Sequence, residues 1–125
     1  MSNEGKFVWS DLTIPNADKV RDFYSKVFNW SAEEVDMGDY SDYSMKKENG
    51  EVVGGICFKK GINNNFPPFW INYIAVNDIK ETLSKATDLG AEIIVSPNPD
   101  SSYQMAVIKD NAGAFIGIFE EKKSD

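Results

Sequence analysis

Apolar and polar residues alternate along several short stretches of the chain and recur at steps of three and four along two others. Alternation typical of strands covers roughly 7–14, 30–36, 42–47, 51–59, 69–76, 92–95, 103–109 and 114–120. Helical spacing predicts a helix over 16–28, because Ala17, Val20, Tyr24 and Val27 form one apolar stripe.

A second helix is predicted directly after Asp78. Asp78 with Glu81 three places later forms a capping box, and Gly90 stands where a left-handed residue ends a helix. Asn49-Gly50 favours a two-residue hairpin that pairs the strands on either side of it. The element order is therefore βαβββ twice, and the two starts superpose when Trp9 is aligned with Trp70.

We therefore expect an α+β fold in which two βαβββ modules in tandem form a curled mixed sheet around a central cleft. The chain has 125 residues, which suits one domain covering 1–125. Module one is expected at about 6–60, the linker at 61–68 and module two at about 69–120.

Charge and composition narrow the choice of partners. Thirteen basic and twenty acidic residues give a net charge of −7, which disfavours nucleic acid and anionic membranes. No apolar run is long enough to span a bilayer, and the first residues lack the pattern of a signal peptide, so a cytoplasmic protein is expected. No glycine-rich nucleotide-binding loop is present, and no cofactor is expected.

The chain has no histidine, so a Ser-His-Asp triad and a Cys-His pair are both excluded. Cys57 lies in an apolar stretch, and we expect it to pack in the core as a small hydrophobe. Any catalysis would depend on carboxylates, tyrosine, lysine, serine or a bound group.

Six stretches spread over nearly the whole chain resemble the vicinal oxygen chelate superfamily, the glyoxalase, bleomycin-resistance and extradiol-dioxygenase group. They are Phe7–Leu12, Phe23–Trp30, Val53–Ile56, Trp70–Val76, Leu89–Ala91 and Asp110–Phe115. The resemblance implies the paired-module fold. It also implies four metal-ligand positions, which fall here on Trp9 or Ser10, Gly54 or Gly55, Trp70 or Ile71, and Gly117. None of these side chains suits a divalent metal, so no metal site is expected and the chain is most similar to the metal-free members.

Alternation places Trp9 and Asp11 on the strand face that points toward the cleft. Asp11 is the best candidate to orient a ligand or act as a base, although it could instead bond a neighbouring loop or a partner subunit. Tyr73 could present its phenol to the cleft, or pack as an ordinary core tyrosine.

Met105, Phe115 and Gly117 complete the predicted ligand-binding residues. Gly117 would leave room for a bound molecule, unless it marks a bulge or a tight bend. Together these positions favour a flat, largely apolar or aromatic ligand bound without a metal. The alternative is a lyase, isomerase or dioxygenase-type enzyme, metal-dependent through unrecognised ligands or metal-free through Asp11 and Tyr73. A homodimer is expected, with aromatics such as Trp30 or Phe66 suited to its interface.

Overall fold

The computed structural model describes residues 2–60 and 66–121, and its fold is α+β with parallel and antiparallel strand pairs. Its elements are β1 (Phe7–Ile14), α1 (Ala17–Phe28), β2 (Ser31–Asp36), β3 (Ser41–Lys46), β4 (Val52–Phe58), β5 (Trp70–Val76), α2 (Ile79–Asp88), β6 (Glu92–Val95), β7 (Met105–Lys109) and β8 (Phe115–Glu120). The predicted order, βαβββ twice, is confirmed, and the largest error in a boundary is at β7, which begins at Met105 instead of residue 103.

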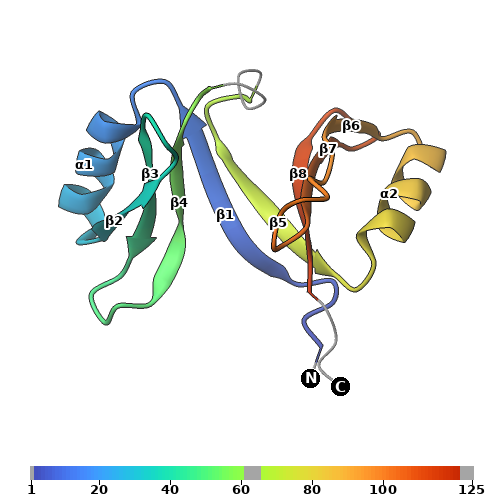
Figure 1. Ribbon diagram of the computed structural model, residues 1–125, viewed down its shortest axis with the longest axis horizontal. Coiled ribbons are helices and arrows are strands. Elements are labelled where there is room, and N and C mark those ends of the chain that lie inside the picture. The colour runs from blue at the N-terminus through green and yellow to red at the C-terminus, as the bar shows by residue number, and fades with distance from the viewer. Residues whose placement is uncertain (1, 61–65, 122–125) are drawn as a thin grey trace. The chain divides into compact units, whose positions relative to one another are not determined.

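The chain divides into two compact units (Figure 1). The α1 unit comprises Ser10–Trp70, and the α2 unit comprises Met1–Trp9 together with Ile71–Asp125. The start of the chain joins the α2 unit because Gly5 N–H donates to the Ala75 carbonyl at 2.8 Å and Ala75 N–H donates to the Lys6 carbonyl at 2.9 Å.

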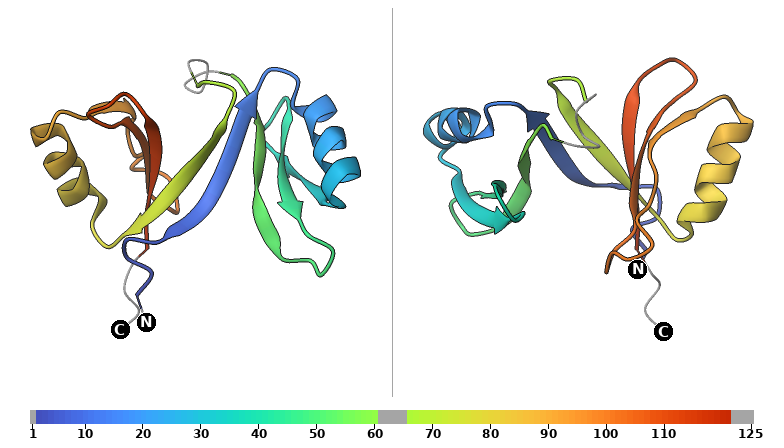
Figure 2. Two further views of the ribbon diagram at one scale, coloured as in Figure 1. Left: turned by 180° about the vertical axis from the view of Figure 1, so that it is seen from behind. Right: turned by 45° about the horizontal axis from the view of Figure 1, so that its top comes forward.

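Both units have the same strand topology (Figure 2). The order is β2-β3-β4-β1 in the α1 unit and β5-β8-β7-β6 in the α2 unit. In each unit the first strand pairs in parallel with the last, while β2, β3 and β4, like β6, β7 and β8, pair antiparallel. The internal repeat therefore extends from the sequence to the strand pairing.

Each helix covers one face of the strands in its own unit (Figure 1). Beneath α1 the buried core consists of Leu12, Ile14, Ala17, Tyr43, Met45 and Ile56. Beneath α2 it consists of Ile79, Leu83, Ala106, Ile108 and Ile118. The opposite face of each set of strands is called its open face below.

The start of α2 confirms half of the predicted capping box. The Asp78 side chain accepts a hydrogen bond from the Glu81 N–H at 3.1 Å, but the Glu81 carboxylate pairs with Lys85 at 3.2 Å instead of returning to the cap. Gly90 has φ +100°, as expected for the left-handed residue that follows a helix.

The predicted two-residue turn at Asn49-Gly50 is wrong, although β3 and β4 do pair. The Lys47 carbonyl accepts from the Gly50 N–H at 2.8 Å, and the Lys47 N–H donates to the Glu51 carbonyl at 2.9 Å. Only Gly50 has a positive φ (+89°), so this is a longer turn than the Asn-Gly type, in which both residues are left-handed. Residues 110–114 repeat the same pattern of hydrogen bonds.

Two further observations bear on partners. Phe66 is 4% exposed, which corrects its suggested place at an interface, whereas Trp30 is half-buried. Residues 61–65 of the predicted linker lie outside the described residues. Over the two described ranges, neither helix combines the length and apolar composition that crossing a membrane requires.

Candidate functional site

The open face of the α1 unit presents a row of polar side chains. Side chains at paired positions of neighbouring strands lie on the same face, and the register pairs Asp11 with Gly55 and Thr13 with Cys57. Ser44 also pairs with Gly55. Because the alternate positions of these strands form the core under α1, the side chains of Asp11, Thr13, Ser44 and Cys57 belong to the open face.

Asp42, two residues before Ser44, lies on the same face and forms a hydrogen bond with Cys57. The Cys57 thiol donates to the Asp42 carboxylate, whose Oδ1 also accepts from the Phe58 N–H at 2.9 Å. Burial raises the pKa of Asp42 in spite of these two hydrogen bonds.

Burial is also the main cause of the strongly raised pKa of the Cys57 thiol, and the charges of Asp11 and Asp42 add to it. At neutral pH Cys57 is therefore a protonated thiol and a poor nucleophile. Cys57 is partly buried on the open face and its thiol is hydrogen-bonded to Asp42, so it does not pack simply as a small hydrophobe of the core, as the sequence predicted.

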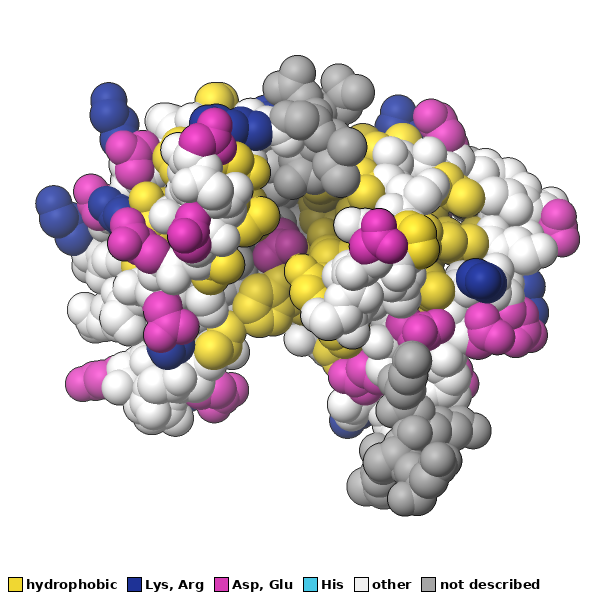
Figure 3. Space-filling view, viewed as in Figure 1, with side chains coloured by type: hydrophobic (Ala, Val, Ile, Leu, Met, Phe, Trp, Pro, Cys, Tyr) yellow, Lys and Arg dark blue, Asp and Glu magenta, His cyan; other side chains and the backbone are white. Residues whose placement is uncertain are grey.

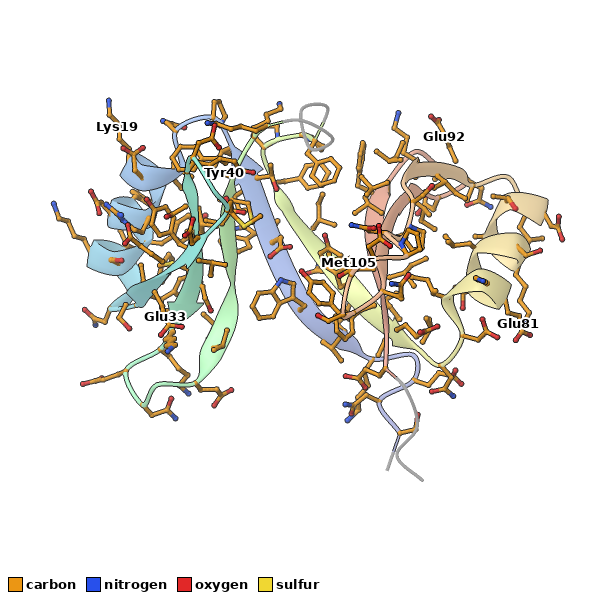
Figure 4. The ribbon with its side chains drawn as sticks, in the orientation of Figure 1. Lys19, Glu33, Tyr40, Glu81, Glu92 and Met105 are labelled. Atoms are coloured by element: carbon orange, nitrogen blue, oxygen red, sulfur yellow. The ribbon has the colours of Figure 1, made fainter. Side chains whose placement is uncertain are left out.

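An aromatic pair borders the Asp42 carboxylate. The rings of Tyr40 and Phe58 meet edge to face with centroids 6.0 Å apart, and Lys60 Nζ lies 4.5 Å from the Tyr40 centroid. Tyr40 immediately precedes β3 (Figure 4). Burial and the nearby charge of Asp42 raise the pKa of its phenol.

Sequence reasoning missed Asp42, Tyr40 and Cys57 as a group of residues on and beside the open face of the α1 unit. A signal was available for Asp42, because Tyr43 and Met45 are apolar and Asp42 and Ser44 are polar, which places Asp42 off the core face. The pairing of Asp42 with Cys57 depends on the register of β3 against β4, which one sequence does not specify.

The open face of the α2 unit is mainly apolar and aromatic. Its register pairs Tyr73 with Gly117, Met105 with Phe119, and Lys109 with Phe115. Ala106, Ile108 and Ile118 occupy the alternate positions and pack under α2. The structure therefore brings four predicted site residues onto one face: Tyr73, Met105, Phe115 and Gly117. Figure 4 shows Met105 on the side of β7 away from α2.

Gly117 makes space for a side chain of this unit. A Cβ atom at position 117 would overlap the ring of Tyr73, which is 2% exposed. The ring of Tyr73 thus fills the space that Gly117 leaves on the open face. Tyr73 is packed like a core residue, which was one of its two predicted roles.

Two further ring contacts extend this face. Tyr103, which is 52% exposed, stacks on Phe119 with centroids 6.0 Å apart. Lys109 Nζ lies 5.5 Å from the centroid of Phe115. Tyr103 is not among the predicted site residues, although the predicted strand 103–109 placed it on the same side as Met105.

The remaining predicted site residues lie on β1. Asp11 belongs to the α1 unit, and Trp9 belongs to the α2 unit, where its side chain is half-buried. The structure therefore places Asp11 in one unit and Trp9, with the four residues above, in the other.

The residues at the four family ligand positions do not fit a divalent metal. A Cβ atom at Gly54 would lie 2.6 Å from the Ser10 carbonyl oxygen, and one at Gly117 would meet Tyr73, so neither position has space for a ligating side chain. Over the described ranges 2–60 and 66–121, no three His, Cys, Asp or Glu residues gather closely enough to hold a metal ion.

Comparison with known proteins identifies matches over most of the chain. The family model described as Glyoxalase/Bleomycin resistance protein/Dioxygenase superfamily matches residues 6–118. The candidate glyoxylase CFP32 of Mycobacterium tuberculosis is 28% identical over 118 residues, covering 92% of this chain and 45% of that protein. The anthracycline biosynthesis protein DnrV of Streptomyces peucetius is 25% identical over 130 residues, covering 94% and 47%. The chain thus spans about half the length of the curated relatives it matches.

Solved structures share the fold at low sequence identity. The hypothetical protein BH1468 from Bacillus halodurans matches with TM-score 0.66 and 14% identity, covering 97% of each chain. Methylmalonyl-CoA epimerase from Streptomyces coelicolor matches with TM-score 0.63 and 9% identity, covering 98% of this chain and all of its own. At these identities the likeness concerns the fold alone.

Proposed function

Since the chain belongs to the Glyoxalase/Bleomycin resistance protein/Dioxygenase superfamily, we propose that it binds a small, flat, largely apolar or aromatic organic molecule without a metal. The observation that supports this most is the aromatic open face of the α2 unit, which carries Met105 and Phe115 together with the stacked pair Tyr103 and Phe119. Aromatic and thioether side chains offer a polarisable surface on which planar rings stack.

Asp11 supplies the polar part of the proposal. Its carboxylate lies on the open face of the α1 unit, and a carboxylate is a strong hydrogen-bond acceptor. Asp11 is proposed to accept a hydrogen bond from a ligand N–H or O–H group. The prediction that the ligand occupies a cleft between the two modules stays a prediction.

Native mass spectrometry tests the proposal. The protein would be purified without a tag from cells grown with added manganese, zinc, nickel and iron. We expect an organic adduct and no stoichiometric metal, and about one metal per chain would overturn the metal-free assignment. Asp11→Asn should lower the occupancy of the adduct, whereas Asp18→Asn, on the exposed surface of α1, should leave it unchanged.

A second candidate function is catalysis of a proton transfer, and the raised pKa of Asp42 favours it. A carboxyl group whose pKa is raised beside other titratable groups is suited to act as a general acid or base. In this case Asp42→Asn would abolish turnover of the bound compound and leave its binding in place.

We further propose that the chain forms a homodimer. Phe23, Val27 and Phe28 on α1 are each more than half exposed, and burying such side chains is favourable. The same native spectrum reports the subunit number, and a monomer at micromolar concentration would contradict this assignment.

A further inference from the structure

Lys109 places a positive charge on the aromatic open face of the α2 unit. It is the last residue of β7 and pairs in register with Phe115, the first residue of β8. Its ammonium group lies 5.5 Å from the centroid of the Phe115 ring, so the side chain extends across that ring. A lysine in this position contributes both an apolar stem and a cation to the face.

This ammonium group has no carboxylate partner among residues 2–60 and 66–121. Glu92 is its register partner on the neighbouring strand β6, yet the two side chains form no ion pair. Figure 4 shows Glu92 pointing outward from the edge of the unit. Lys109 thus adds a cation to a face on which Glu92 is its register neighbour and whose other side chains are mostly apolar.

The neighbouring residues determine which anion fits. Met105 and Phe115 belong to this face, and the stacked pair Tyr103 and Phe119 extends it. Such a surface binds planar rings and offers few hydrogen bonds to a small hydrated anion. An ammonium group beside stacked rings matches a ring that has an acidic substituent.

We propose that Lys109 and Phe115 form a subsite for the anionic group of a planar aromatic ligand, such as an aromatic carboxylate or phenolate. The inference rests on the proposed function and adds a charge to the ligand class. The net charge of the chain is −7, which by itself repels an anionic ligand. Acidic side chains are indeed spread over the visible face of the molecule (Figure 3), so the preference would depend on the local cation.

The test compares two probes of the same shape, 2-naphthoate, which is an anion at neutral pH, and 2-naphthamide, which is neutral. Their affinities for the full chain are measured by NMR titration at low ionic strength. An exposed ion pair is expected to make 2-naphthoate bind about two- to five-fold more tightly than 2-naphthamide. The preference should shrink as salt is added, because salt screens exposed charges.

Three variants test whether Lys109 causes the preference for 2-naphthoate. Lys109→Met should abolish the preference and Lys109→Arg should retain it. Lys80→Met, which removes one charge from the exposed surface of α2, should leave the preference unchanged. Equal affinities in the wild type, or a preference that persists in Lys109→Met, would overturn the subsite while the proposed function stands. Failure of both probes to bind would overturn the aromatic ligand class itself, and the subsite with it.

Discussion

Replacing Gly117 by alanine tests the packing that organises the open face of the α2 unit. The added Cβ would overlap the ring of Tyr73, which is 2% exposed and has little space to move. Forcing an extra methyl group into a filled core costs about 1–3 kcal/mol. Replacing glycine by alanine also stabilises the folded protein by about 0.4–1 kcal/mol, because it lowers the conformational entropy of the unfolded chain. The middle of these two ranges gives an expected net loss in the free energy of unfolding of about 1.3 kcal/mol.

Urea unfolding followed by circular dichroism measures this loss. With an m value of about 2 kcal/mol/M, the midpoint should fall by about 0.5–1 M. In a Tyr73→Leu background the ring is absent, so the alanine should cost little or stabilise the protein. If Gly117→Ala were as stable as the wild type or more stable, the ring of Tyr73 could not occupy the space beside position 117.

The remaining predictions concern titration and hydrogen bonding. Burial raises the pKa of Asp42 on folding, so its contribution to stability is complete below the unfolded value of about 3.9 and is lost as the pH rises through the raised value. The unfolding free energy of the wild type relative to Asp42→Asn should fall over that window, and an increase would contradict the sign. Backbone N–H groups of Ala114 and Ala112 lower the pKa of Asp110, so Asp110→Ala should destabilise the protein at neutral pH by an amount that shrinks as the pH falls below about 4. Asp42→Asn should also speed modification of Cys57 by a thiol reagent at pH 8, because the thiol loses a neighbouring negative charge, and an unchanged rate would argue against their hydrogen bond.

The fold could be predicted because its signals are local. The apolar stripes of both helices, the cap at Asp78 and the left-handed Gly90 each depend on residues within a few positions of one another. The turn at Lys47–Glu51 was misjudged because Asn-Gly fits more than one hairpin geometry.

The candidate site could be predicted only in part. Alternation was enough to place Met105 and Phe115 on one face, because a strand side chain is assigned to a face by its position alone. The filling of the Gly117 position by Tyr73 and the hydrogen bond from Cys57 to Asp42 join residues on different strands. Such contacts depend on strand register and burial, which composition and spacing do not determine.

The central claim is that the open face of the α2 unit binds a planar organic molecule, and an ¹H–¹⁵N NMR titration with 2-naphthamide tests it most directly. We predict saturable shifts at the backbone amides of Met105, Phe115 and Gly117, with little change on the exposed surface of α2. Shifts confined to the helices, or no saturable shift at millimolar probe, would contradict the account.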